Sequence, residues 1–85
     1  MIVATYSVHN EAPLISPKAA GLGPGRWLVK LYARGETERH TDQIRNSQPC
    51  HLSDLLQLAV QTHDDMLNEL GWLVVDAGFQ VLRLR

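Results

Sequence analysis

Four histidines and one cysteine are the side chains of this chain best suited to binding a transition metal ion. A zinc site needs three or four ligands, commonly arranged as two closely spaced pairs. Cys50 and His51 are adjacent, so their side chains diverge. The remaining histidines have no partner at a ligand spacing; they are His9, His40 and His63. We therefore predict no metal site and no cofactor.

Nucleophilic catalysis would require Cys50 or a serine beside a histidine that a third group orients. No motif in the sequence frames such a set. Cys50 is the one candidate reactive thiol, and packing as a small apolar side chain is its simpler interpretation. His63 falls on the apolar face of a predicted helix, where a histidine at the edge of the core is expected. We therefore expect a protein that is not an enzyme.

The run Gly21-Leu22-Gly23-Pro24-Gly25 has the glycine content of a phosphate-binding loop. Such a loop follows a strand, opens a helix and offers backbone N–H groups to the phosphates. Here Pro24 removes one N–H group, no Lys-Ser/Thr pair follows, and the next predicted element is a strand. The run is better interpreted as a turn that enters this strand.

Basic residues alternate along the clearest predicted strand, which covers residues 26–34. Its apolar residues would face the core, and its cations and one tyrosine would face outward. Cations of the last strand would join them if that strand lies beside this one. Cations around an aromatic ring on a sheet are typical of modules that bind phosphates and stack bases. Such modules usually present two or three aromatic rings. The candidate nucleic-acid-binding residues are Arg26, Lys30, Tyr32, Arg34, Arg83 and Arg85.

Acidic and amide residues form the outward stripe of the predicted helix. Residues 51–71 contain four acidic residues and no Lys or Arg. Such a surface repels nucleic acid and attracts a basic surface of a partner protein. The candidate partner-binding residues are Asp54, Gln57, Gln61, Asp64, Asp65 and Glu69. For this face and for the basic one, a surface that simply keeps the protein solvated is the alternative interpretation.

The elements that would position these residues follow from periodicity and turn residues. Apolar residues spaced by three and four from Leu52 to Leu70 predict an amphipathic helix. Alternation predicts strands over 2–8 and 26–34, and a hairpin of 72–75 and 79–84 turning at Asp76-Ala77-Gly78. Residues 10–25, with three prolines and three glycines, predict a long loop. The polar segment 36–48 is left open between a short exposed helix and an irregular connection.

These elements predict an α+β fold in which an antiparallel sheet of about four strands, in ββαββ order, packs one amphipathic helix on one face. The length of 85 residues fits a single domain, 1–85, with a small core. A lone cysteine and the lack of a long apolar stretch favour a cytoplasmic protein.

Apolar residues in the loop and on expected outward faces also suggest contact with a partner; they are Leu14, Ile15, Leu22, Leu28 and Val60. We expect a small interaction module that binds another protein through the acidic helix face, the loop 10–25 or a free sheet edge, as an accessory or inhibitor protein. The thin core also favours pairing with a second copy as a homodimer, and no membrane association is expected. Nucleic acid is the alternative partner.

Overall fold

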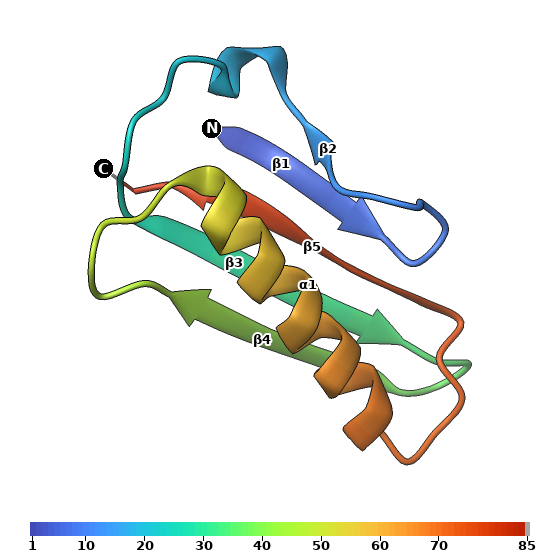
Figure 1. Ribbon diagram of the computed structural model, residues 1–85. Coiled ribbons are helices and arrows are strands. Elements are labelled where there is room, and N and C mark those ends of the chain that lie inside the picture. The colour runs from blue at the N-terminus through green and yellow to red at the C-terminus, as the bar shows by residue number, and fades with distance from the viewer. Residues whose placement is uncertain (85) are drawn as a thin grey trace.

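Alternating apolar residues build the sheet of this protein, whose computed structural model describes residues 1–84. The strands are β1 (Ile2–Ser7), β2 (Leu14–Ile15), β3 (Trp27–Arg34), β4 (Arg39–Arg45) and β5 (Asp76–Arg83). They form one antiparallel sheet in the order β2-β1-β5-β3-β4. The helix α1 (Leu52–Glu69) runs diagonally across one face, and β1 and β2 lie beside it (Figure 1). The α+β class with an antiparallel sheet and one helix on one face is confirmed.

The two faces of the sheet are defined by the register of its central strands. Val29 lies opposite Val81, and Leu31 lies opposite Phe79. These residues pack beneath α1, whose buried side chains are Leu55, Leu56, Ala59, His63 and Met66. Because side chains alternate along a strand, the even-numbered residues of β3 and β5 and the odd-numbered residues of β4 lie on the other side. We call that side the open face.

The order of the elements differs from the predicted one, because β4 precedes α1 and a single strand follows it. Six of the seven residues of β4 are exposed, and Ile44 is the only large apolar residue among them. An edge strand exposed on both faces shows no apolar alternation, so segment 36–48 could not be recognised as a strand. The structure places no strand over 72–75; Trp72 instead packs against Gly35 and the core.

Gly78, predicted to lie in a turn, lies within the central strand β5. A Cβ atom at this position would collide with the carbonyl oxygen of Tyr6 and would lie 3.0 Å from the hydroxyl of Tyr32. Glycine at this position therefore lets the Tyr6 carbonyl and the Tyr32 side chain approach the backbone of β5 closely. Such a close approach is a common reason for a glycine inside a strand.

The predicted loop 10–25 contains the two-residue strand β2 and a short 3-10 helix, η1 (Pro17–Ala19). The side chain of Ser16 accepts a hydrogen bond of 3.2 Å from the backbone N–H of Lys18 at the start of η1. Ala19 is buried in the core, while Leu14 and Ile15 of β2 remain exposed. The loop thus places two apolar side chains on the surface at the sheet edge.

Among residues 1–84, no helix is long enough and apolar enough to cross a lipid bilayer.

Candidate functional site

A groove lies between α1 and β2, where the helix leaves the edge of the sheet uncovered. Its volume is about 700 Å³, and its apolar lining comes from Pro13 and Ile15 on one side and from Leu56 and Val60 on the other. Ile15 is 55% exposed although it lies in this lining. The α1–β2 groove is therefore an apolar surface that the chain does not cover itself.

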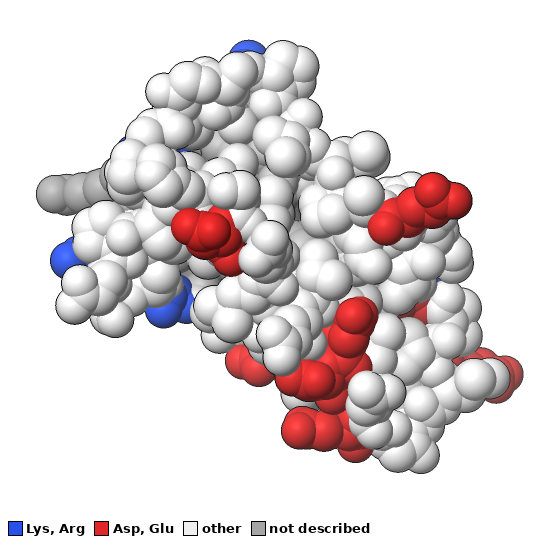
Figure 2. All heavy atoms as spheres, viewed as in Figure 1, with Lys and Arg blue, Asp and Glu red and all other residues white. Residues whose placement is uncertain are grey.

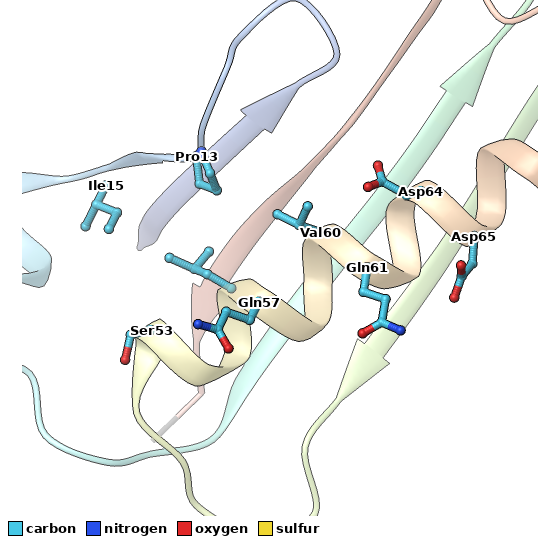
Figure 3. Close-up of a pocket in the computed structure, with 9 residues that line it drawn as sticks. Pro13, Ile15, Ser53, Gln57, Val60, Gln61, Asp64 and Asp65 are labelled. Carbon is cyan, nitrogen blue, oxygen red and sulfur yellow. The ribbon is translucent and has the colours of Figure 1, made fainter.

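Polar side chains of α1 border the α1–β2 groove. Figure 3 shows Val60 and Asp64 directed toward the β2 side, whereas Gln61 and Asp65 project away from it. Four of the six predicted partner-binding residues contribute to the lining, together with Ser53; they are Gln57, Gln61, Asp64 and Asp65. Asp54 and Glu69 are exposed on the same helix but do not line this groove. The sequence indicated the acidic rim and, separately, the apolar residues Ile15 and Val60, but it did not indicate that these two line one groove.

The acidic character extends over the helix side of the molecule. Red acidic side chains gather over α1 in Figure 2, and Lys and Arg appear only at the margins of this view. Among the described residues, no Lys or Arg lines the α1–β2 groove. The groove is thus apolar at its base and negative at its rim.

Four predicted nucleic-acid-binding residues lie on the side of the sheet opposite to α1. Lys30, Tyr32 and Arg34 are even-numbered residues of β3, and all belong to the open face. Arg26 precedes β3 and continues its alternation, since the carbonyl group of Arg26 accepts a hydrogen bond of 2.8 Å from the N–H of Leu84. Arg85 lies outside the described residues.

The predicted placement of Arg83 on the open face is wrong. Arg83 lies opposite Trp27 on the helix side, with its guanidinium carbon 4.6 Å from the centre of the indole ring. It donates a hydrogen bond of 2.9 Å to the carbonyl of Gly23 and one of 3.4 Å to that of Pro24. The sequence suggested that Leu82 and Leu84 face the core, but Phe79 and Val81 take that side of β5. Arg83 therefore shares the helix side with them and contacts Trp27.

Two further cations of the open face come from β4 and were missed by sequence reasoning. Arg39 lies opposite Arg34, and Arg45 lies opposite Leu28. Both arginines are exposed. In the sequence, these two arginines alternate with other polar residues along segment 39–45. This pattern is a weak indication of a strand, because the intervening positions are mostly polar as well.

Tyr32 lies in the middle of the open face, opposite Thr41 on one side and Gly78 on the other. Burial raises the pKa of its hydroxyl above the ordinary value, Asp76 raises this pKa further, and Arg34 opposes the shift. The hydroxyl is therefore neutral at physiological pH, and the ring leans across Gly78.

His63 and Cys50 occupy structural positions. His63 is 1% exposed, with its Nδ1 atom 3.3 Å from Oδ1 of Asp64 and its Nε2 atom unpartnered among the described residues. Its ring meets that of Tyr6 edge-on, with the ring centres 5.2 Å apart.

Cys50 exchanges two backbone hydrogen bonds of 3.0 Å with Gly25, and its carbonyl accepts one of 3.0 Å from the indole N–H of Trp27. Within residues 1–84, no three His, Cys, Asp or Glu side chains are grouped so that they could hold a metal ion.

The fold and these surfaces define a small α+β protein with an antiparallel sheet that carries a helix on one face only. A search of protein-family models found none that matches this chain. Comparisons with curated proteins and with solved structures likewise returned no match.

Proposed function

We propose that this protein is a non-catalytic interaction module whose α1–β2 groove receives a segment of a partner protein. The segment would carry two or three apolar side chains beside Lys or Arg. The observation that carries the proposal is the exposed Ile15, which faces Leu56 and Val60 across a groove that has two carboxylates at its rim.

The chemistry of the groove selects this kind of partner. Apolar side chains that enter the groove would remove Ile15 and Val60 from water, and burying one such side chain fully is worth about 1.5–3 kcal/mol. Asp64 and Asp65 would attract cations of the partner, which favours encounter and orientation. The groove lining offers these carboxylates no cation among the described residues.

Selection from a random-peptide library tests the proposal. We expect the immobilised protein to enrich peptides that combine Leu, Ile, Val or Phe with Lys or Arg. Ile15→Ser should lower the affinity of enriched peptides by about tenfold or more, the equivalent of 1.4 kcal/mol or more. The matched control is Leu14→Ser, because Leu14 is equally exposed, adjoins Ile15 and does not line the groove.

Charge-removing substitutions test whether the carboxylates at the groove rim contribute to binding while other acidic residues of α1 do not. Asp64→Asn should weaken the enriched peptides and reduce the salt dependence of their binding, whereas Asp54→Asn should change neither, because Asp54 lies outside the groove lining. Enrichment of acidic peptides, or equal effects of Ile15→Ser and Leu14→Ser, would rule out the groove as the binding site.

A module of this size that binds a partner protein through the α1–β2 groove would act as an accessory or inhibitor protein of that larger partner. The half-buried free thiol of Cys50 supports a reducing compartment. We therefore propose the cytoplasm, and a reporter fusion that localises to an oxidising compartment would contradict this.

The free edge of β4 supports pairing with a second copy. Its register with β3 is uninterrupted from Arg45 to Arg39, without a bulge or a proline to block it. The N–H of Gly35 donates a hydrogen bond to the carbonyl of Glu38, which fixes which residue pairs of β3 and β4 are hydrogen-bonded to each other. In this pattern the N–H of Thr41 points away from β3, toward the free edge. We propose a dimer across this edge. Sedimentation velocity should show it, and Thr41→Pro should leave only monomer; a monomeric unmodified protein would contradict it.

A further inference from the structure

The open face gathers most of the positive charge of a protein whose net charge is −1. Five of the eight Lys and Arg residues lie on it in the described part of the chain: Arg26, Lys30, Arg34, Arg39 and Arg45. Within residues 1–84, Asp76 is the one carboxylate that strand alternation places on this face, and Asp42 of β4 also lines the hollow beside Tyr32, where its Oδ1 atom accepts a hydrogen bond of 2.8 Å from the N–H of Gln43. The helix side is acidic, so the charges are divided between the two sides of the sheet.

The cations of the open face are not used for internal ion pairs. Among the described residues, the only basic side chains within 4.0 Å of a carboxylate oxygen are His9 and His63, so no Lys or Arg forms an ion pair. Arg34 and Arg39 face each other directly across β3 and β4. Like charges in such a pair destabilise a sheet. This cluster is therefore unfavourable for folding and is available to an anionic ligand.

An aromatic ring lies among these cations. The hydroxyl of Tyr32 lies 3.0 Å from the position that a Cβ atom of Gly78 would take, so the ring leans over the backbone of β5. Tyr32 is half-buried, with its remaining surface open to solvent. A ring fixed in this way is a platform on which a base can stack.

A hollow of about 740 Å³ beside the ring adds hydrogen-bonding groups. Lys30, Gln43 and Gln80 form one row across the sheet, and Thr41 adjoins Tyr32 in the next row. Amide and hydroxyl side chains in such a hollow can donate hydrogen bonds to base edges and accept hydrogen bonds from them. Cations for phosphates, a ring for stacking and amides for base edges are thus present together.

We infer that the open face binds single-stranded nucleic acid, with the phosphates on the five cations and one base stacked on Tyr32. Duplexes are read mainly by a helix or a two-stranded ribbon that enters a groove, and the only long helix of the described chain is acidic. Bases of a single strand are unpaired and can reach a ring on a sheet. The inference is independent of the α1–β2 groove, which lies on the other side of the sheet.

Fluorescence anisotropy with labelled oligouridylate and oligothymidylate of about 12 nucleotides tests the inference. Each phosphate contact contributes about −0.7 to the slope of log affinity against log salt for single strands, so five contacts predict a slope of about −3.5. Raising the salt from about 50 to about 200 mM should then weaken binding about a hundredfold. A preference between the two probes distinguishes RNA from DNA as the source of the strand.

The combined change Lys30→Gln and Arg34→Gln should reduce the slope by about 1.4 and weaken binding at low salt. Lys18→Gln is the matched control, because Lys18 is an exposed cation in η1, outside the open face. Tyr32→Ala should weaken binding by about fivefold or more, whereas Tyr32→Phe should retain it, since stacking requires the ring and not the hydroxyl.

Binding that ignores salt, or equal effects of the control and the combined change, would overturn the inference. Tighter binding of a duplex of the same length would also overturn it, in favour of a double-stranded ligand. If Tyr32→Ala fails to fold, the combined change Lys30→Gln and Arg34→Gln still tests the inference through the salt dependence of binding.

Discussion

The two faces of the sheet share the same strands and differ in almost every physical property. On the helix side, Val29, Leu31 and Phe79 are excluded from water beneath α1. On the open face, the neighbouring residues Lys30 and Gln80 are exposed. Successive side chains of a strand point to opposite faces, so a core position and a surface position are neighbours at Val29–Lys30 and at Phe79–Gln80, whereas Leu28 is buried on the open face.

The comparison shows how a small chain can hold one core and two separate surfaces. The helix side supplies the burial that stabilises the fold, and its margin at β2 leaves the α1–β2 groove uncovered. On the open face Leu28 is buried opposite Leu82, whereas the five cations are exposed and form no ion pair among the described residues. Four acidic residues lie on α1 and five cations lie on the open face, which keeps ligands of opposite charge apart.

The largest expected effect is at the buried side of β5. Phe79→Ala should lower the free energy of unfolding by about 3–5 kcal/mol, because it leaves a cavity beneath α1. Its neighbour Gln80 lies on the open face, and Gln80→Ala should stay within about 0.5 kcal/mol. Urea denaturation followed by circular dichroism measures both. Similar losses for the two variants would contradict the assignment of the faces.

A second variant tests whether the open face tolerates change at its centre. Gly78→Ala should cost about 2 kcal/mol, because the new Cβ atom would collide with the carbonyl oxygen of Tyr6. Gly71→Ala is the matched control, since nothing lies within 4 Å of a Cβ atom there. Denaturant midpoints compare the two variants. A neutral Gly78→Ala would show that β1 and β5 are not as close as the structure places them.

A third, smaller effect separates two arginines that look alike in the sequence. Arg83→Ala should lose about 1 kcal/mol, because Arg83 covers Trp27 and donates to two backbone carbonyls. Arg45→Ala, on the open face, should leave stability unchanged within about 0.5 kcal/mol. Thermal unfolding monitored by tryptophan fluorescence reports on both. An equal loss for Arg45→Ala would mean that the open face contributes to stability after all.

The smallest effect is expected at the one buried ionisable side chain of the helix side among the described residues. His63→Leu should change stability by less than about 1 kcal/mol in either direction, because the leucine removes an unpartnered Nε2 atom while it loses the edge-on contact with Tyr6. Equilibrium denaturation in urea measures the change. A loss well above 2 kcal/mol, on the scale of a broken buried hydrogen-bond network, would indicate that His63 has a partner.

The candidate surfaces were predictable only in part. The acidic helix residues and the cations of β3 could be named from the sequence, because α1 and β3 each bury one face and show it as a pattern. The apolar groove could not be predicted, since it depends on where Ile15 of β2 meets Val60 of α1. Arg39 and Arg45 could not be added, and Arg83 could not be excluded, before the register of β4 and β5 was known.

The sequence by itself determined α1, β3, most of β1 and the fold class. The helix α1 and most of β3 bury one side, and that side fixes the spacing of their apolar residues. In β1 the register shifts between Ile2 and Ala4, and Val3 and Ala4 are both buried. Tertiary structure decided the rest. β4 is an edge strand exposed on both faces, and β5 is a central strand that contains Gly78, where Tyr6 and Tyr32 fill the space of a side chain. Neither arrangement leaves a periodic pattern, because the contacts that stabilise it lie on neighbouring strands.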